Sequence, residues 1–205
     1  MADVPSVAAD EALMLRYQRG DRRAFGELVR RHKTPVYNFV LRHLRSPSAA
    51  EDITQEAFLR VVQRAAEFKH EARFTTWLYT IARNLCIDHG RKMKLRRHPS
   101  LDAPTNDSGS SRPMLEVLPD PRPEGDVGRA AEWTAMRRSI VVAVEALPED
   151  QREVFLLREV ANLPFAEIAQ VTGAAENTVK SRMRYALERL RLALSEFEEY
   201  ARALR

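Results

Sequence analysis

The chain has 205 residues, of which 44% are apolar, and its formal net charge is only +4. Such a length can bury one good core or two small ones, and a basic excess of this size matters only where it is clustered. The single Cys86 excludes an intramolecular disulfide, and the lack of a membrane-length apolar run or a signal-peptide pattern predicts a cytoplasmic protein.

Helical periodicity dominates the N-terminal half, and no segment alternates with period two for long enough to predict a strand. A short helix over residues 11–19 is expected to end at Gly20. Asp21 is expected to cap a longer helix, which Pro35 should kink or interrupt. The apolar side of this longer helix is predicted to contain Phe25, Leu28, Val29, His32, Val36, Phe39 and Val40.

Two further helices are predicted before residue 98. Ser48 with Glu51 three residues later is typical of a capping box, which would open a helix reaching about Ala66. Thr75 is expected to cap the last helix, which reaches about Lys92. The inward positions of both helices are predicted to be Ile53, Ala57, Phe58, Val61, Val62, Leu78, Ile81, Ala82 and Leu85. Residues 1–97 are therefore predicted to form an all-α domain.

The last of these helices has a polar flank beside its apolar stripe. The residues of this flank are Trp77, Thr80, Asn84 and Arg91. A basic run follows, made of Arg91, Lys92, Lys94, Arg96 and Arg97. An aromatic ring, an amide and a cationic run suit single-stranded nucleic acid, whose bases stack on rings. Trp77 could equally be a core residue, and the basic run a solvated helix end that complements the helix dipole.

A linker is predicted over residues 98–131. This segment holds six Pro, four Ser and three Gly and almost no apolar periodicity, which is unsuitable for a compact helix. It has six acidic residues against three basic ones. A net negative strand would avoid DNA or lie in a channel built for nucleic acid, and a merely solvated tether explains the composition equally well.

Residues 163–194 have the order of a helix-turn-helix motif, with a short helix over 165–171, a turn at Gly173 and a longer helix. Gly173 can supply the positive φ that the connection needs. The longer helix is expected to bury Val179, Met183, Ala186, Leu187, Leu190, Leu194 and Phe197. Its other face has side chains that bind bases or phosphates, namely Asn177, Lys180, Ser181, Arg184 and Tyr185. The alternative is an ordinary helical hairpin with a solvated basic face.

Three motifs in this order carry a family resemblance: AEDITQEAFLR at 50–60, FTTWLYTIARN at 74–84, and LPEDQREVF at 147–155 with TVKSR at 178–182. They resemble the extracytoplasmic-function (ECF) RNA polymerase sigma factors, group IV of the sigma-70 family. The resemblance implies two small helical domains, sigma domain two over 1–97 and sigma domain four over 132–205, joined by the flexible linker. The linker would then thread toward the active centre of the polymerase.

The resemblance also implies a polymerase-docking face on the helix of the first motif. The residues that match it are Asp52, Gln55, Glu56 and Leu59. In the family this helix docks on a coiled coil of the largest polymerase subunits. Asp52 and Glu56 could in addition simply stabilise their own helix, by about 0.3 to 1 kcal/mol each.

For the promoter minus-ten element, the resemblance implies a pocket that captures a flipped base. The matching residues are Arg60, Phe68, Ile81 and Asn84, and Trp77 and Arg91 of the polar flank complete the minus-ten candidates. Asn84 is the best candidate for reading a base edge, and Phe68 is expected to line the pocket rather than to be simple core. Residues 69–72 read KHEA where the family loop often has Gly or Asp.

The recognition helix is implied to read the minus-thirty-five element in duplex DNA. The candidate residues are Asn177, Thr178, Lys180, Ser181, Arg182, Arg184 and Tyr185. Lys180, Ser181 and Arg184 are expected to reach bases, and Arg182 a phosphate, because it lies nearer the apolar edge.

No catalytic site or cofactor is predicted. Cys86 and His89 are only two potential metal ligands, whereas structural zinc needs four. The predicted function is a promoter-specificity subunit whose partners are core RNA polymerase, promoter DNA as duplex and melted strand, and, as is frequent in the family, an anti-sigma factor. The alternatives are an autonomous helix-turn-helix regulator of the response-regulator effector type and a small-molecule or metal-binding helical protein. The first leaves the polymerase-docking motif unexplained, and the second explains neither basic face.

Overall fold

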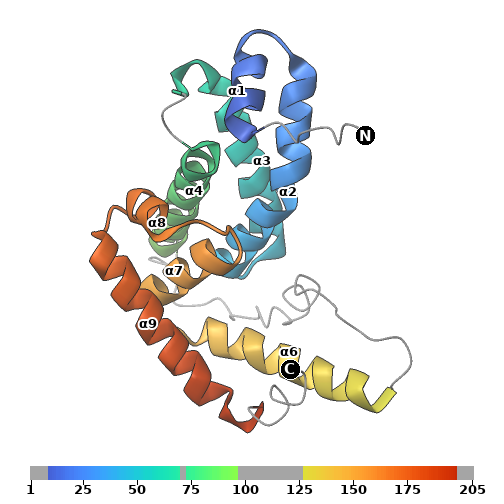
Figure 1. Cartoon of the computed structure of the whole chain (residues 1–205), viewed down its shortest axis with the longest axis vertical. Coiled ribbons are helices and arrows are strands. Elements are labelled where there is room, and N and C mark those ends of the chain that lie inside the picture. The colour runs from blue at the N-terminus through green and yellow to red at the C-terminus, as the bar shows by residue number, and fades with distance from the viewer. Residues whose placement is uncertain (1–8, 70–72, 97–126, 198–205) are drawn as a thin grey trace, which may run out of the picture.

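The computed structural model describes residues 9–69, 73–96 and 127–197, and every regular element within these ranges is a helix (Figure 1). This confirms the predicted all-α fold class. None of the helices in these ranges combines the length and the apolarity that a membrane span requires.

The N-terminal half consists of α1 (Asp10–Gln18), α2 (Arg22–Leu44), α3 (Pro47–Gln63), the 3-10 turn η1 (Ala65–Glu67) and α4 (Phe74–Arg96). The turn after α1 contains Gly20 at a φ of 98°, as its place in the sequence indicated. Asp21 caps α2 as predicted, because its Oδ1 accepts hydrogen bonds from the amides of Arg23 at 3.0 Å and Ala24 at 3.3 Å. Pro35 lies inside α2, which continues through it without interruption.

Two predicted helix starts are wrong by a residue or two. The N-cap of α3 is Ser46, whose hydroxyl accepts from the Ala49 amide at 3.4 Å, so Ser48 does not cap this helix. Pro47 then occupies the first helical position, where its fixed φ and missing N–H cost nothing. The helix α4 begins at Phe74, so Thr75 lies within its first turn and does not cap it.

The core of this half is built from the stripes predicted by helical periodicity. Phe39 and Leu78 of these stripes are among its most deeply buried side chains. Phe74 and Tyr79, which the prediction did not include, are buried with them, and Phe39 meets Tyr79 edge to face at 5.4 Å. Of the predicted inward residues of α3 and α4, only Val62 is exposed. It follows the buried Val61 by one position, a turn of about 100° that carries it out of the stripe.

The C-terminal half contains α6 (Val127–Glu145), α7 (Glu149–Glu159), α8 (Phe165–Thr172), α9 (Glu176–Ala193) and the 3-10 turn η2 (Ser195–Phe197). The helix-turn-helix is confirmed, since α8 ends at Gly173, which has a φ of 71° and bonds its amide to the Ala169 carbonyl at 2.9 Å. The predicted linker is too long at its C-terminal end, because residues 127–131 belong to α6. Residues 97–126 lie outside the described ranges.

Leu187 was expected in the core but is 49% exposed. On α9 the buried stripe is Val179, Met183, Ala186 and Leu190. The partners of this stripe are α6, α7 and α8, which cover one side of α9 only (Figure 1). Leu187 lies one residue beyond Ala186, outside that covered side.

The two halves of the chain pack against each other mainly where α4 lies against α8 and where α2 lies against α7 (Figure 1). Arg83 donates two hydrogen bonds to the buried carboxylate of Glu153, at 2.7 and 3.2 Å. The Thr76 hydroxyl donates to Glu167 at 2.6 Å. One face of α4 is therefore covered by the helix-turn-helix half.

Candidate nucleic-acid interface

An aromatic cluster of Phe68, Phe74 and Trp77 lies where the chain enters α4. The ring centroid of Phe68 is 5.3 Å from that of Trp77 and 6.1 Å from that of Phe74. Phe68 is only 5% exposed and Phe74 is fully buried, so Phe68 is a core residue, contrary to the expectation above. Trp77 is half-buried, which leaves part of its ring accessible beside the cluster.

The remaining minus-ten candidates differ in their solvent exposure and in whether they already have a partner. Asn84 is exposed, and its amide has no hydrogen-bond partner among the described residues. It lies two turns, about 10 Å, beyond Trp77 on the same flank of α4. Ile81 is buried between them, and the half-buried Arg60 is tied to Glu56 at 3.0 Å.

Farther along α4, Arg91 is exposed and lies 4.0 Å from Asp88. Lys92 is exposed as well, while Lys94, Arg96 and Arg97 fall outside the described side chains. Thr80 donates its hydroxyl to the Thr76 carbonyl at 2.7 Å, so that hydroxyl is already engaged. The structure thus leaves Trp77, Asn84 and Arg91 as the accessible members of the predicted flank.

The recognition face of α9 is more open. Asn177, Thr178, Lys180, Arg184 and Tyr185 are exposed, whereas Ser181 and Arg182 are half-buried. Lys180, Ser181, Arg182 and Arg184 make local contacts within the C-terminal half, and exposed ion pairs are worth about 0 to 1 kcal/mol.

Those local contacts are specific. Lys180 pairs with Glu176 at 2.6 Å, and the Arg184 guanidinium lies over the Tyr185 ring at 4.9 Å. The Ser181 hydroxyl donates to the Asn177 carbonyl at 2.9 Å. Arg182 pairs with Asp150 of α7 at 2.5 Å, so in this state it connects two helices instead of pointing freely outward.

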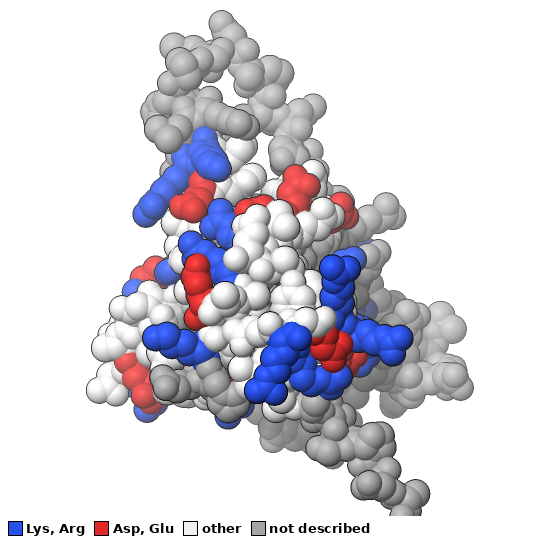
Figure 2. All heavy atoms as spheres, turned by 90° about the horizontal axis from the view of Figure 1, so that it is seen from above, with Lys and Arg blue, Asp and Glu red and all other residues white. Residues whose placement is uncertain are grey.

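On the face shown in Figure 2, charge is distributed in groups. Figure 2, which looks onto the end where α1 and α2 meet, shows Lys and Arg in several separate groups with Asp and Glu among them and an uncharged area between. This end therefore has no continuous basic field.

Two family models match this chain, Sigma-70 region 2 over residues 28–96 and Sigma-70 region 4 over residues 137–190. The RNA polymerase sigma-H factor of Pseudomonas aeruginosa is 31% identical over 185 residues, which cover 90% of this chain and 93% of that protein. The chain belongs to the ECF sigma factors of the sigma-70 family. The ECF RNA polymerase sigma-E factor of Escherichia coli is likewise 31% identical, over 87% of this sigma factor and 91% of the relative.

Solved structures share the fold of this sigma factor. The structure of CnrH in complex with the cytosolic domain of CnrY has a TM-score of 0.63 at 21% identity and covers 92% of this chain and 99% of that one. The sigma factor RpoE in complex with the anti-sigma factor NepR from Bartonella quintana has a TM-score of 0.59 at 20% identity, with 83% and 96% covered. The family membership confirms the predicted function: a subunit that binds core RNA polymerase and directs promoter-specific initiation.

On α3 of the sigma factor, Asp52, Gln55 and Leu59 are exposed at spacings of three and four residues, so they share one face. Leu59 is 49% exposed, a large apolar side chain beside two polar ones. Glu56 is half-buried and paired with Arg60. The four residues of the predicted docking face thus lie on one helix, three of them open to a partner.

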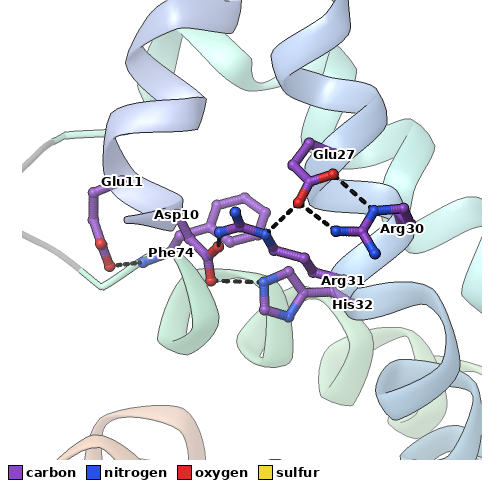
Figure 3. A network of polar contacts seen from close by, with 7 residues as sticks. All are labelled: Asp10, Glu11, Glu27, Arg30, Arg31, His32 and Phe74. Atoms are coloured by element: carbon purple, nitrogen blue, oxygen red, sulfur yellow. Dashed lines mark hydrogen bonds and ion pairs between the residues drawn. The ribbon is translucent and has the colours of Figure 1, made fainter. Parts of the chain in front are cut away.

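A network of charged residues that sequence reasoning missed joins α1 to α2 (Figure 3). The Asp10 carboxylate lies 2.7 Å from His32 Nε2 and 2.8 Å from Arg31. The hydrogen bond with His32 lowers the pKa of Asp10, and burial opposes this effect in part. Hydrogen bonds from Arg30 and Arg31 lower the pKa of Glu27 to about 2. No sequence signal marks these contacts, because Asp10 and His32 are 22 residues apart.

Cys86 is a buried free cysteine, and burial raises the pKa of its thiol to about 12. A thiol held in its protonated form is a poor metal ligand and a poor nucleophile. Among the described residues, no group of three or more His, Cys, Asp or Glu could hold a metal ion.

Proposed function

We propose that this sigma factor reads its promoter at two points. The polar flank of α4 captures a base of the opened minus-ten strand, and the exposed face of α9 reads the minus-thirty-five duplex. Residues 1–97 form the polymerase-docking and melting domain, and the helix-turn-helix half forms the upstream reader. The observation that carries the first point is the exposed Asn84 amide, which has no partner within the described ranges and lies on the flank of Trp77.

The chemistry of α4 supports capture of an unstacked base. An extruded base costs a few kcal/mol in lost stacking, which an aromatic wall and polar groups on the base edge can offset. Trp77 supplies a partly accessible ring, and Asn84 can donate and accept hydrogen bonds. Arg91 can neutralise a phosphate. Phe68 and Phe74 act from behind, because their buried rings support Trp77.

For the duplex, Lys180 and Arg184 are the principal base readers and Asn177, Thr178 and Tyr185 line the same face. Their local ion pairs and stacking contacts are weak enough to exchange for DNA contacts. Ser181 and Arg182 lie at the half-buried edge, and Arg182 can turn to a phosphate only when it releases Asp150. On α3, Asp52, Gln55, Glu56 and Leu59 dock on the polymerase.

The chain has no catalytic activity of its own in this proposal and requires no cofactor, because its work is recognition. It acts in the cytoplasm with core polymerase. A protein inhibitor comparable to the anti-sigma partner in the RpoE structure is expected to control it.

The test uses holoenzyme reconstituted from core polymerase and this sigma factor, with transcription measured from a promoter library randomised at both elements. Asn84→Ala should reduce discrimination at minus-ten about fivefold or more, since a base-reading side chain is worth roughly 1 to 3 kcal/mol. Asn177→Ala is the matched control, because it makes the same change on the other reading face. Unchanged minus-ten preference with Asn84→Ala would remove α4 from base recognition.

Arg184→Ala and Lys180→Ala test the upstream reader. Each should change the preferred minus-thirty-five sequence, whereas loss of a phosphate contact weakens all sequences alike. Arg189→Ala removes the same charge from an exposed position farther along α9 and should leave sequence preference intact. If Arg184→Ala and Arg189→Ala behave alike, the α9 face does not read bases.

A further inference from the structure

The short helix α1 contacts both ends of the segment that joins η1 to α4. At the first end, Gln18 Nε2 donates to the carbonyl oxygens of Ala65 at 2.7 Å and Phe68 at 3.0 Å. At the second end, Glu11 Oε1 accepts from the Phe74 amide at 3.1 Å. The match to Sigma-70 region 2 begins only at residue 28, so α1 lies outside it.

Glu11 satisfies an amide that has no partner inside its own helix, and Gln18 adds a hydrogen bond to the Ala65 carbonyl, which also accepts from the Phe68 amide at 3.2 Å. A primary amide has two N–H donors, so Gln18 can hold two carbonyls of the η1 turn at once. The Phe74 amide is one of the first four N–H groups of α4, which have no partner inside the helix. A carboxylate there also complements the positive end of the helix dipole.

The helix α1 is itself held in place by contacts with the core and with α2. Leu13 and Met14 are buried in the core, and Arg16 pairs with Asp21 at 2.7 Å. Asp10 is bound to Arg31 and His32 of α2 (Figure 3). The His32 ring in turn packs on the Phe74 ring at 5.5 Å, so the network reaches the start of α4.

We propose that α1 positions the minus-ten pocket, with Gln18 and Glu11 as positioning residues. Gln18 fixes where the chain leaves η1 and therefore where the Phe68 ring supports Trp77. Glu11 fixes the first residue of α4 and therefore the placement of Trp77 and Asn84 along one flank. The inference rests on the proposed role of that flank in base capture.

The experiment compares variants of Gln18 in reconstituted holoenzyme. Gln18→Glu keeps the size and helix propensity of the side chain but replaces both donors by acceptors that repel the carbonyls. Gln18→Lys restores donors and is the rescue variant. Arg19→Gln is the matched control, because it changes the net charge by the same amount at the neighbouring exposed position. Glu11→Ala tests the second end of the segment.

Base discrimination at minus-ten should fall about two- to tenfold with Gln18→Glu, and similarly with Glu11→Ala, the range that corresponds to one hydrogen bond. Minus-thirty-five preference and the amount of sigma factor bound to core polymerase should be unchanged. Gln18→Lys and Arg19→Gln should retain most of the wild-type discrimination. A merely structural role would lower the folded fraction and both preferences together, and that result would overturn the proposal.

Asn84→Ala measured in parallel separates the two levels of inference. If Asn84→Ala loses minus-ten discrimination while Gln18→Glu and Glu11→Ala keep it, the proposed positioning role of α1 is wrong and the proposed base-capture role of Asn84 is retained. If Asn84→Ala also keeps minus-ten discrimination, the base-capture role of the α4 flank is wrong. The positioning role of α1, which rests on it, is then wrong as well. An equal loss of minus-ten discrimination with Arg19→Gln would show an effect of net charge and would likewise overturn the positioning role of α1.

Discussion

The α4 flank and the α9 face differ in how their residues are held. Behind the α4 flank, Phe68, Phe74 and Ile81 are buried, and only part of the flank is open. On α9, five of the seven candidates are exposed, and the contacts of Lys180 and Arg184 are a local ion pair and a guanidinium lying over a ring. A proposed site for an unstacked base is thus built into the core, whereas a proposed duplex reader is added to the outside of a stable helix.

This difference has an energetic reason. An extruded base needs a preformed aromatic surface to stack on, and such a ring is rigid only when its other side is packed against the core. A duplex offers its base edges in an open groove, so long side chains on a fixed helix suffice to reach them. Substitutions on α4 should therefore affect stability and recognition together, and substitutions on α9 mainly recognition.

The largest expected effect is that of Phe68→Ala. Removal of this buried ring should cost about 3 to 5 kcal/mol in the free energy of unfolding, because it opens a cavity beside Phe74 and Trp77. Tyr185→Ala on the exposed α9 face should cost less than about 0.5 kcal/mol. Urea denaturation measures both, and Phe68→Leu should recover part of the loss. Equal costs at the two positions would refute the contrast between a packed and an open site.

Arg83→Ala should have the next largest effect. It leaves the buried Glu153 carboxylate without its two hydrogen bonds, which should destabilise the protein by about 1 to 3 kcal/mol. The comparison is Arg182→Ala, whose partner Asp150 is 64% exposed, so its loss should cost less than about 1 kcal/mol. Thermal unfolding gives the ranking, and amide exchange of α4 should rise only with Arg83→Ala. If Arg182→Ala is the more costly, the contact between the two halves contributes little.

The network of charged residues that joins α1 to α2 makes a prediction about how stability depends on pH. Because the pKa of Asp10 is lower in the folded state, the unfolded chain binds the proton first, so stability is present above the ordinary pKa of about 4 and is lost as pH falls further. Asp10→Asn should lower the free energy of unfolding by about 1 to 2 kcal/mol at neutral pH, with a difference that shrinks below about pH 4. Asp88→Asn, which alters an exposed carboxylate on α4, is the control and should lower the free energy of unfolding by less than about 0.5 kcal/mol at neutral pH.

The smallest expected effect is that of Glu176→Gln on α9. Loss of its exposed pair with Lys180 should change stability by less than about 0.5 kcal/mol. It also removes a negative charge from the face proposed to read DNA, so holoenzyme should bind the upstream duplex about twofold more tightly at low salt. The gain should disappear at high salt, where exposed charges are screened. A large change in stability would show that the α9 face is not loosely held.

Local pattern accounts for most of what could be predicted. The helix stripes, the Asp21 cap and the Gly173 turn depend on neighbours within one or two turns, and all three are present. The misplaced start of α3 has the same origin, since Ser46-Pro47 and Ser48 with Glu51 are both local start signals and the structure uses the first. The family motifs at 50–60, 74–84 and 147–155 are local as well, which is why they identified the function before any contact was known.

The sequence by itself therefore determined an all-α sigma factor and the faces on which its DNA-binding candidates lie. Only the tertiary structure decided that Phe68 is buried and Leu187 exposed, because burial depends on which helices meet. It also decided that Gln18 holds Phe68 across 50 residues and that Glu11 holds Phe74 across 63. Contacts at such separations have no periodic signature, since they arise from the packing of helices whose individual patterns are already satisfied.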